Sequence, residues 1–554
     1  MLTAFIPLVV LVYSSIQLQG FACFLPTTSF LIWLLLTLIA LKEYLPFWLE
    51  SISRDGELYS LLSAQAKFQW VTVCWIAVLF ALSAPAMLFG EAICRFFPQA
   101  FPAIVAFAIY TGIFKISAKA FYKAFFHYRF LVRSTRDYFR ARMAIPALFF
   151  PPMLVWLTTE DVFLSSFNEG TAILKTFGLV PIFFFALYTF SPLLFNLAWD
   201  AKPLSNDEIE KEVQTLAGNS KVPLAGMRLW DTFGEPLPNA AVAGLVDGYR
   251  FLYVTKYLLD IFPLNEIRAI VAHELGHFRL GHVWTYLIFS LNLAFFSLGV
   301  GLVVYWHYPN FMADHQTVYF GFEFMIFLGA YFLLFSTLAR YCEWQADMFA
   351  ATLVSPSNLS KALKTISELI AQPSAWLPWW TETHPRFPKR ISEIQNWNGS
   401  AETLQRNAKI IRIAMTLIGS VIFILSWPLI RESLNLERAN EAFRSRRFHE
   451  VRGYLTPLQQ SFETHQDVLV LSGKLEMAEG KFLNAIFIAA KKTLGISVPL
   501  FPSPLEESKH SAPPEIAFQL QLMKFILQMP NLNGIHGVTP FNKSFNFIQT
   551  MFRH

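Results

Sequence analysis

Long apolar stretches alternate with polar segments along most of the chain. A helix needs about 20 apolar residues to cross a hydrocarbon core. The candidate spans are residues 4–25, 28–48, 69–92, 99–116, 144–158, 172–198, 284–306, 317–338 and 409–430. The pattern predicts a mainly α, multi-pass α-helical membrane protein, in which 144–158 is the weakest span because it is short and contains two adjacent prolines.

Composition agrees with a membrane protein. The 554 residues are 54% hydrophobic and only 15% charged, outside the usual balance of a soluble globular chain. The formal net charge of +5 is too small to argue for nucleic acid as a partner. Because the four cysteines form no CxxC pair, we interpret them as reduced packing residues. The first apolar stretch has no basic segment before it, so we expect a span and not a signal peptide.

Basic residues in the short loops predict the orientation. Residues 115–142 hold eight lysines and arginines and one acid, so this loop should be cytoplasmic. The next loop, residues 158–170, holds acids and no base, which indicates that the chain has crossed. The span 172–198 then returns the chain, and residues 199–283 should face the cytoplasm. We expect the inner membrane of a bacterium.

Residues 199–283 have the pattern of a small α+β domain. Ser205 or Asn206 is a candidate cap for a helix that begins with acidic residues. The segments MRLW (227–230) and RFLYV (250–254) are rich in strand formers, and an Asp-Gly turn predicts a hairpin with AAVAG (240–244) as a strand. The last segment, PLNEIRAIVAHELGH, returns to helical periodicity.

The helical segment carries an HExxH motif. His273 and His277 are four residues apart, so they project from one face of a helix at a separation that suits one zinc ion. Glu274 lies beside them, where it could take a proton from water. The alternative is an amphipathic helix whose polar face happens to carry these residues.

A zinc site needs a third protein ligand. The pattern HExxHxxGxxH fails, because Leu280 and Val283 stand at the last two positions. His282 is roughly half a revolution out of phase with His273 on a continuous helix, so we expect an interfacial residue there.

The predicted hairpin of 284–306 and 317–338 returns the chain to the HELGH side just before RYCEWQADMFA. We therefore expect Glu343 as the ligand. Asp347, one turn later, is expected to accept a hydrogen bond from a ligating histidine, with a solvated helix acid as the alternative.

Three motifs in order carry a family resemblance. VAHELGHFRLGH, EWQADMFA and THPRFPKRI, with a transmembrane hairpin between the first two, resemble the integral-membrane zinc metalloproteases of the CAAX prenyl protease 1 and HtpX group. The resemblance covers about 172–396, with the CAAX-protease branch most similar. It implies one zinc ion per chain, a polypeptide substrate and Glu274 as the general base.

The resemblance also implies roles outside the HExxH helix. His384 would donate to the oxyanion, and Arg390 would orient Glu343 or the substrate carbonyl. In the family a strand binds substrate as an added β-strand, a role that falls on Asn239, Ala241, Val242, Ala243 and Gly244. Relatives tend to have aromatic residues where this chain has Ala241 and Ala243, and an ordinary edge strand is the alternative.

The chain changes character after its last span. Residues 435–496 are amphipathic, and Phe448 and Phe482 are 34 positions apart, as in tetratricopeptide repeats. A plain helical hairpin is the alternative, because two such units are few. We predict a transmembrane region at 1–198, a zinc peptidase region at 199–408 including a hairpin at 284–338, a last span at 409–430, and a helical tail at 431–554 on the opposite side.

Two functions from different classes fit the sequence. The first is a membrane zinc endopeptidase that acts on membrane-associated or misfolded polypeptides. The second is a catalytically idle membrane scaffold or transporter-like protein that binds a protein partner through its tail. The intact HExxH, the third ligand and the His-Pro element favour the enzyme, because a scaffold needs none of them. Membrane lipid is an expected partner of either.

Overall fold

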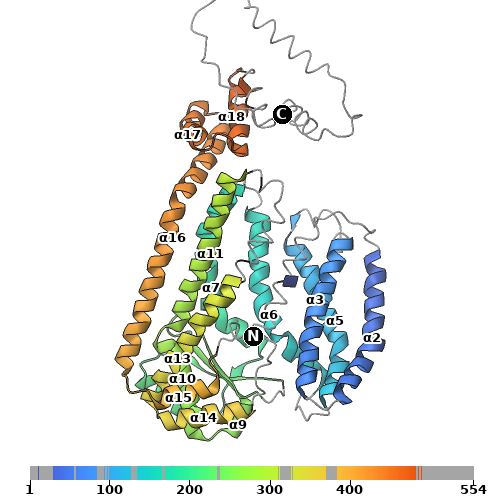
Figure 1. The fold of residues 1–554 in the computed structure, drawn as a ribbon, viewed down its shortest axis with the longest axis vertical. Helices are drawn as coiled ribbons and strands as arrows, with labels where there is room; N and C mark the ends of the chain where they lie inside the picture. Colours follow the sequence, from blue (N-terminus) through green and yellow to red (C-terminus); the bar gives the residue numbers. More distant parts are fainter. Residues whose placement is uncertain are drawn as a thin grey trace, which may run out of the picture. The chain divides into compact units, whose positions relative to one another are not determined.

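The computed structural model describes most of the chain. The described parts are residues 29–54, 58–83, 99–126, 134–164, 169–233, 237–309, 329–369 and 384–481, with a few isolated positions besides. They are mainly α-helical, with one small sheet (Figure 1). They divide into two compact units: Met1–Asn168, Lys175–Ser297 and Phe320–Ile422 in the first, and Glu169–Leu174, Leu298–Tyr319 and Phe423–His554 in the second.

Six helices of the described parts are long and apolar enough to cross a membrane. These segments are Leu31–Ile52, Ala100–Ala124, Thr135–Val162, Lys175–Ala198, His282–His307 and Ala401–Arg444. A shorter apolar helical segment, Lys67–Phe80, overlaps the predicted span 69–92. The predicted span 4–25, apart from residues 10 and 11, and half of 317–338 lie outside the described residues. The chain thus has the character of an integral membrane protein.

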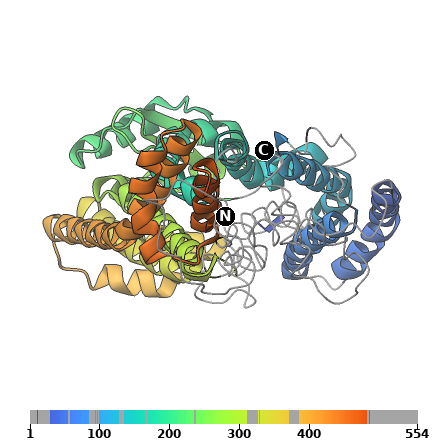
Figure 2. The ribbon, with the colours of Figure 1, turned by 90° about the horizontal axis from the view of Figure 1, so that it is seen from above.

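The helices α2 (Ser29–Arg54), α3 (Leu58–Ser83), α5 (Ala100–Phe126) and α6 (Thr135–Thr159) pack in succession through the first unit. The blue helices α2, α3 and α5 lie side by side in Figures 1 and 2. Their shared core is built from aliphatic and aromatic side chains, including Phe68, Tyr110 and Phe121.

Two details of this region differ from the prediction. Residues 115–142 are not one loop, since α5 continues to Phe126 and α6 begins at Thr135. The side chain of Ser134 accepts a hydrogen bond from the backbone N–H of Asp137 and so caps α6. The adjacent prolines do not weaken the span, because α6 runs through Pro146, Pro151 and Pro152. In an apolar environment a helix satisfies the remaining backbone groups better than an open turn would.

The small sheet has the strand order β1-β2-β4-β3. Its strands are β1 (Lys202–Pro203), β2 (Gly226–Trp230), β3 (Ala240–Ala243) and β4 (Phe251–Thr255). β2 and β4 are parallel, whereas β3 and β4 form the predicted antiparallel hairpin. α8 (Asp207–Asn219) precedes β2, and its cap is Asn206, whose side chain accepts from the backbone N–H of Ile209. The predicted strand 240–244 and the predicted cap are confirmed.

A layer of helices packs against the sheet. After α9 (Lys256–Ile261), α10 (Leu264–Arg279) shares a core with β4 and α8, including Val213, Leu252, Val271 and Leu275. α10 also contacts α13 (Ser336–Leu353) and α14 (Pro356–Leu369), and α15 (Phe387–Gln395) contacts α13 and α14. α13 follows the π-helical segment η3 (Tyr331–Phe335).

Two long helices leave this layer. α11 (His282–His307) begins three residues after α10 ends, and α16 (Ala401–Arg444) follows α15. α7 (Glu169–Ala198) is the apolar helix that leads into β1, after the π-helical segment η2 (Glu160–Leu164) that ends the preceding span. The side-chain amide of Asn292 in α11 donates to the Met415 carbonyl in α16 at 2.8 Å, which joins these two helices within the first unit.

The second unit contains the helices α17 (Phe448–Ser461) and α18 (Gln466–Ala478), which contact each other. Val451, Leu455, Val468 and Leu471 are among their buried residues. Within this unit Trp306 donates from Nε1 to Oγ of Ser433 at 3.0 Å. Phe482 and Ala489, which the repeat-like spacing needs, lie outside the described residues. The tetratricopeptide-like tail therefore stays a prediction.

Candidate metal centre

Three buried side chains from two helices meet at one point. α10 supplies His273 and His277, and α13 supplies Glu343. The two histidine Nε2 atoms are 3.3 Å apart. Glu343 Oε1 lies 3.4 Å from Nε2 of His277, and Glu343 Oε2 lies 3.5 Å from Nε2 of His273. The three side chains therefore form a small triangle of ligand atoms.

The triangle has the dimensions of a zinc site. Zinc that binds four ligands tetrahedrally at ~2.0–2.1 Å separates them by about 3.3–3.4 Å. Two imidazole nitrogens and one carboxylate are a ligand set that zinc accepts while keeping its fourth position open. In addition, Glu343 Oε2 is buried, and no donor in the described part of the chain makes a well-aligned hydrogen bond to it. These residues could hold one zinc ion.

A glycine lets the two helices come close enough to build the triangle. A Cβ at Gly276 would lie 3.2 Å from Cα of Ala346 and 3.2 Å from Cδ1 of Phe349, tighter than ordinary van der Waals contact. Gly276 lies between the two histidines of α10, and Ala346 follows Glu343 by three positions on α13. The close approach of the two backbones at this point therefore brings the Glu343 carboxylate within reach of both imidazoles.

A buried ion pair supports His273. Arg390 on α15 donates from Nε and Nη2 to the two carboxylate oxygens of Asp347, at 2.8 and 2.7 Å. Asp347 Oδ1 lies 2.9 Å from Nδ1 of His273, a contact that is short but bent away from ideal hydrogen-bond geometry. Burial alone would raise the pKa of Asp347, but Arg390 and His273 hold it below its usual range. The carboxylate thus stays charged beside the histidine.

The same charges act on His273 and Glu343. Burial disfavours the protonated form of His273, yet Asp347 and Glu343 raise its pKa to about 10. Burial would raise the pKa of Glu343, but the three histidines around it lower it well below the usual value. The pocket therefore favours a carboxylate together with positive charge, which a divalent cation also provides.

Glu274 and His384 lie at the edge of this buried group. Glu274 follows His273 on α10 and is partly exposed, and its charge acts on Arg390. His384 is two-thirds exposed, with Nδ1 2.8 Å from Glu343 Oε2. Arg390 approaches the same oxygen only at 3.8 Å, so its main partner is Asp347 and not Glu343.

Two further residues of the site, His282 and Gln345, were not predicted from the sequence. His282 was expected at an interface, but it is buried, with Nδ1 3.0 Å from Nδ1 of His277. Its Nε2 lies 3.0 Å from Oε1 of Gln345 on α13. The phase argument was wrong because α10 and α11 are separate helices, and Gly281 between them has a positive φ of 72°. A glycine one residue before His282 was the available signal.

The strand β3 forms one edge of the sheet. Among the described strands it pairs with β4 alone, through the register from Ala240 opposite Val254 to Ala243 opposite Phe251. β3 also contacts α10, the helix of the two histidines. Ala241 and Val242 are half-buried, whereas Ala243 and Gly244 are buried. Asn239, just before the strand, accepts on its carbonyl from the backbone N–H of Thr255 at 3.0 Å.

The region that contains the triangle is similar to a known protein family. Residues 203–398 match the model of peptidase family M48. This region of the chain is therefore similar to M48 peptidases. The family consists of zinc-dependent metalloproteases, and the matched residues contain the helices that form the triangle.

Curated relatives match the same part of the chain. A CAAX prenyl protease 1 homolog of Oryza sativa subsp. japonica is 25% identical over 213 residues, which are 36% of this chain and 50% of that protein. A protease HtpX homolog of Aeropyrum pernix is 31% identical over 198 residues, 32% of this chain and 58% of that protein. This chain thus matches about half the length of the first of these relatives, and the resemblance to the CAAX prenyl protease 1 and HtpX group is confirmed.

A solved structure is also similar. The crystal structure of S. mikatae Ste24p matches with a TM-score of 0.45 and 17% sequence identity, and the match covers 70% of this chain and 99% of that chain.

Proposed function

We propose that the protein is a membrane-embedded zinc endopeptidase that hydrolyses peptide bonds of membrane-associated or misfolded polypeptides. The observation that carries the proposal is the triangle of His273, His277 and Glu343, with ligand atoms 3.3 to 3.5 Å apart beside Glu274. One zinc ion held by these residues would polarise the scissile carbonyl and make water more acidic.

The neighbouring side chains would carry out the proton transfers. Glu274 accepts the proton of the attacking water and later delivers it to the leaving amine. His384, exposed at the edge of the site, donates a hydrogen bond to the carbonyl oxygen as negative charge develops on it. Asp347, paired with Arg390, holds the ring of His273 in place.

The substrate would bind along the edge of the sheet. We expect Asn239, Ala241, Val242, Ala243 and Gly244 to lie along an extended peptide, which would add as a strand beside β3, at the edge of the described sheet. Backbone pairing recognises extended chains of many sequences, so unfolded segments are suitable substrates.

The charge pattern supports a location in the inner membrane of a bacterium, with the site on the cytoplasmic side and the tail on the other side. Lys115, Lys119 and Lys123 on α5 and Arg140 and Arg142 on α6 carry most of this signal. The helical tail at 431–554 is a candidate surface for a protein partner.

Cleavage of an unfolded reporter protein by the detergent-purified protein tests the function. We expect wild type to produce defined peptides by mass spectrometry and Glu274→Gln to be slower by about 10²–10⁴-fold, since it loses the general base. Glu266→Gln is the matched control, because it makes the same change on the first turn of α10, where Glu266 accepts a hydrogen bond from Thr365.

The remaining outcomes point elsewhere. Equal products from wild type and Glu274→Gln would show a contaminating protease. A purified protein that binds zinc but cleaves no reporter would favour the catalytically idle scaffold.

A further inference from the structure

His277, the second histidine of the triangle, contacts another buried histidine, His282, which is not one of the three candidate ligands. His282 is the first residue of α11 and its side chain is 1% exposed. One ring nitrogen lies 3.0 Å from Nδ1 of His277, and the other lies 3.0 Å from Oε1 of Gln345. Gln345, His282 and His277 thus form a continuous buried chain that ends at the Nε2 facing Glu343.

The protons along this chain can be assigned from chemistry. The amide nitrogen of Gln345 faces the hydroxyl of Tyr341 at 3.5 Å, which leaves its oxygen toward His282. An amide oxygen only accepts, so Nε2 of His282 carries the hydrogen. A neutral imidazole has one N–H, so Nδ1 of His282 accepts and Nδ1 of His277 donates to it. His277 therefore presents a bare Nε2, the form that binds a metal.

We propose that His282 and Gln345 are positioning residues that fix the tautomer and the ring orientation of His277 for metal binding. The proposal rests on the proposed zinc function. His273 has a charged support, Asp347 with Arg390, whereas His277 has an uncharged one. A carboxylate behind a ligating histidine raises the basicity of the ligand. Gln345 and His282 form an uncharged hydrogen-bonded relay behind His277. This relay orients His277 without adding a second negative charge to the site.

The fold builds the relay by interrupting a helix. On a continuous helix His282 would be turned by about 140° from His277 and the two rings would diverge. Instead α10 ends at Arg279, and the positive φ of Gly281 redirects the chain so that α11 starts with His282 beside His277. Arg412 of α16 donates to the carbonyl of Leu280 and holds this junction.

Zinc affinity of the purified full-length protein tests the relay without any use of activity. Competition with a chromophoric chelator gives Kd, and the absorption spectrum of the cobalt-loaded protein reports the ligand geometry. We expect His282→Leu and Gln345→Met to bind zinc about 10–100-fold more weakly than wild type. We expect His282→Asn and Gln345→Glu to recover most of the affinity, because each retains an acceptor oxygen at the needed place.

The outcomes separate the relay from the proposed function. Wild type that binds zinc, together with His282→Leu and Gln345→Met of unchanged Kd and cobalt spectrum, would overturn the relay and leave the proposed function intact. Wild type that binds no zinc would overturn the proposed function and the relay with it. If His282→Leu does not fold, Gln345→Met decides, since it keeps the imidazole in the core.

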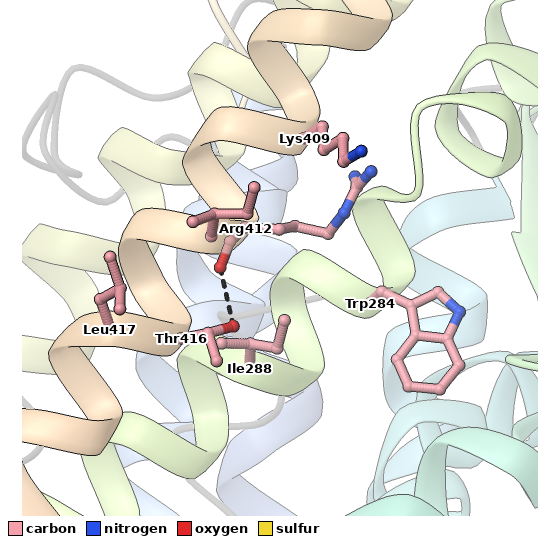
Figure 3. A pocket seen from close by; sticks show the side chains of 7 residues that line it. Trp284, Ile288, Lys409, Arg412, Thr416 and Leu417 are labelled. Carbon is pink, nitrogen blue, oxygen red and sulfur yellow. Dashed lines mark hydrogen bonds between the residues drawn. The ribbon is translucent and has the colours of Figure 1, made fainter.

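A separate observation concerns a groove between two of the apolar helices. Its volume is about 380 Å³, and it is lined by Trp284, Ile288, Lys409, Arg412, Ile413, Thr416 and Leu417 from α11 and α16. Figure 3 shows the charged ends of Lys409 and Arg412 next to each other, with the aliphatic side chains farther along the groove. The positive charges of Lys409 and Arg412 therefore lie at one end of the apolar groove.

We infer that this groove binds an anionic phospholipid. The phosphate would lie between Lys409 and Arg412, and an acyl chain would follow Ile288, Ile413 and Leu417. Both helices are candidate membrane spans, and Trp284 is two residues from the start of α11, where tryptophans meet lipid headgroups. Basic pockets between membrane helices recognise anionic headgroups through this combination of charge and apolar surface.

Native mass spectrometry of the full-length protein, titrated with phosphatidylglycerol and with phosphatidylcholine, tests this site. We expect phosphatidylglycerol to bind more tightly, and Lys409→Gln to weaken its binding about fivefold. Arg406→Gln removes the same charge from α16 outside the groove and should leave binding unchanged. Equal affinity for both lipids, or an equal loss in Arg406→Gln, would overturn the assignment.

Discussion

The peptidase region and the C-terminal helices each contain an arginine that faces two carboxylates. Arg390 pairs with Asp347 and lies 3.8 Å from Glu343, and the three side chains are between 1% and 8% exposed. Arg452 on α17 contacts Glu476 at 3.0 Å and also Glu479, but it is 42% exposed. The chemistry of the two groups is the same, and their contact with water differs.

The difference in exposure determines how much each charge cluster contributes to the free energy of unfolding. Removing one partner from a buried pair leaves the other charge without water or counter-ion, at a cost of about 3–5 kcal/mol. Removing one partner from an exposed pair costs about 0–1 kcal/mol, because water replaces it. Loss of one member of the cluster around Arg390 should therefore destabilise the region strongly, whereas loss of one member of the cluster around Arg452 should change the stability little.

The largest effect is expected from Arg390→Met. It leaves the carboxylate of Asp347 buried without its arginine, so the free energy of unfolding should fall by about 3–5 kcal/mol. Unfolding in detergent micelles, followed by tryptophan fluorescence, measures it. Arg390→Lys keeps the charge but loses the two-pronged hydrogen bond, so it should lie between wild type and Arg390→Met. A loss below about 0.5 kcal/mol in Arg390→Met would remove the contrast with Arg452.

The double variant Asp347→Asn, Arg390→Met should separate folding from metal binding. Because no unpaired charge is left in the core, its stability should exceed that of Arg390→Met alone. Zinc should nevertheless bind about 10–100-fold more weakly than to wild type, because no carboxylate supports His273. Chelator competition and the same unfolding measurement give both quantities. Full zinc affinity in the double variant would show that Asp347 serves only to neutralise Arg390.

The smallest effect is expected from Arg452→Gln. It should cost at most about 1 kcal/mol at low salt and nothing measurable at about 0.5 M salt, where exposed charges are screened. The hydrogen bond from Arg452 lowers the pKa of Glu479. The stabilisation is therefore present above the ordinary carboxylate pKa and is lost as the pH falls through the lowered one. A cost that persists at high salt would contradict this interpretation.

The membrane helices and the triangle could be predicted from the sequence, because each leaves a local pattern in it. A span leaves a long apolar run, and two histidines four residues apart share a helix face. Glu343 followed from counting crossings, since a hairpin returns the chain to the side it left. Ser134, which caps α6, was not recognised, so charged ends of helices were assigned to a loop.

The supporting residues of the site could not be predicted in the same way. His282 reaches His277 only because Gly281 breaks the helix, and that break depends on a single backbone angle. Gly276 matters through its distance to Ala346 on a helix about 70 positions away, which no local pattern encodes. Periodicity predicts the face of one element, whereas these contacts depend on how two elements meet.

The short junction at Leu280 and Gly281 couples the orientation of α11 to the position of His282 beside the site. The helix that holds both histidines and the helix that enters the membrane are joined by two residues, with Arg412 bracing the first of them. Rotation or tilt of the span is therefore transmitted directly to the ring of His282. For the proposed zinc site, we therefore expect the metal content of a preparation to depend on how well the solubilising medium preserves the tilt of that span.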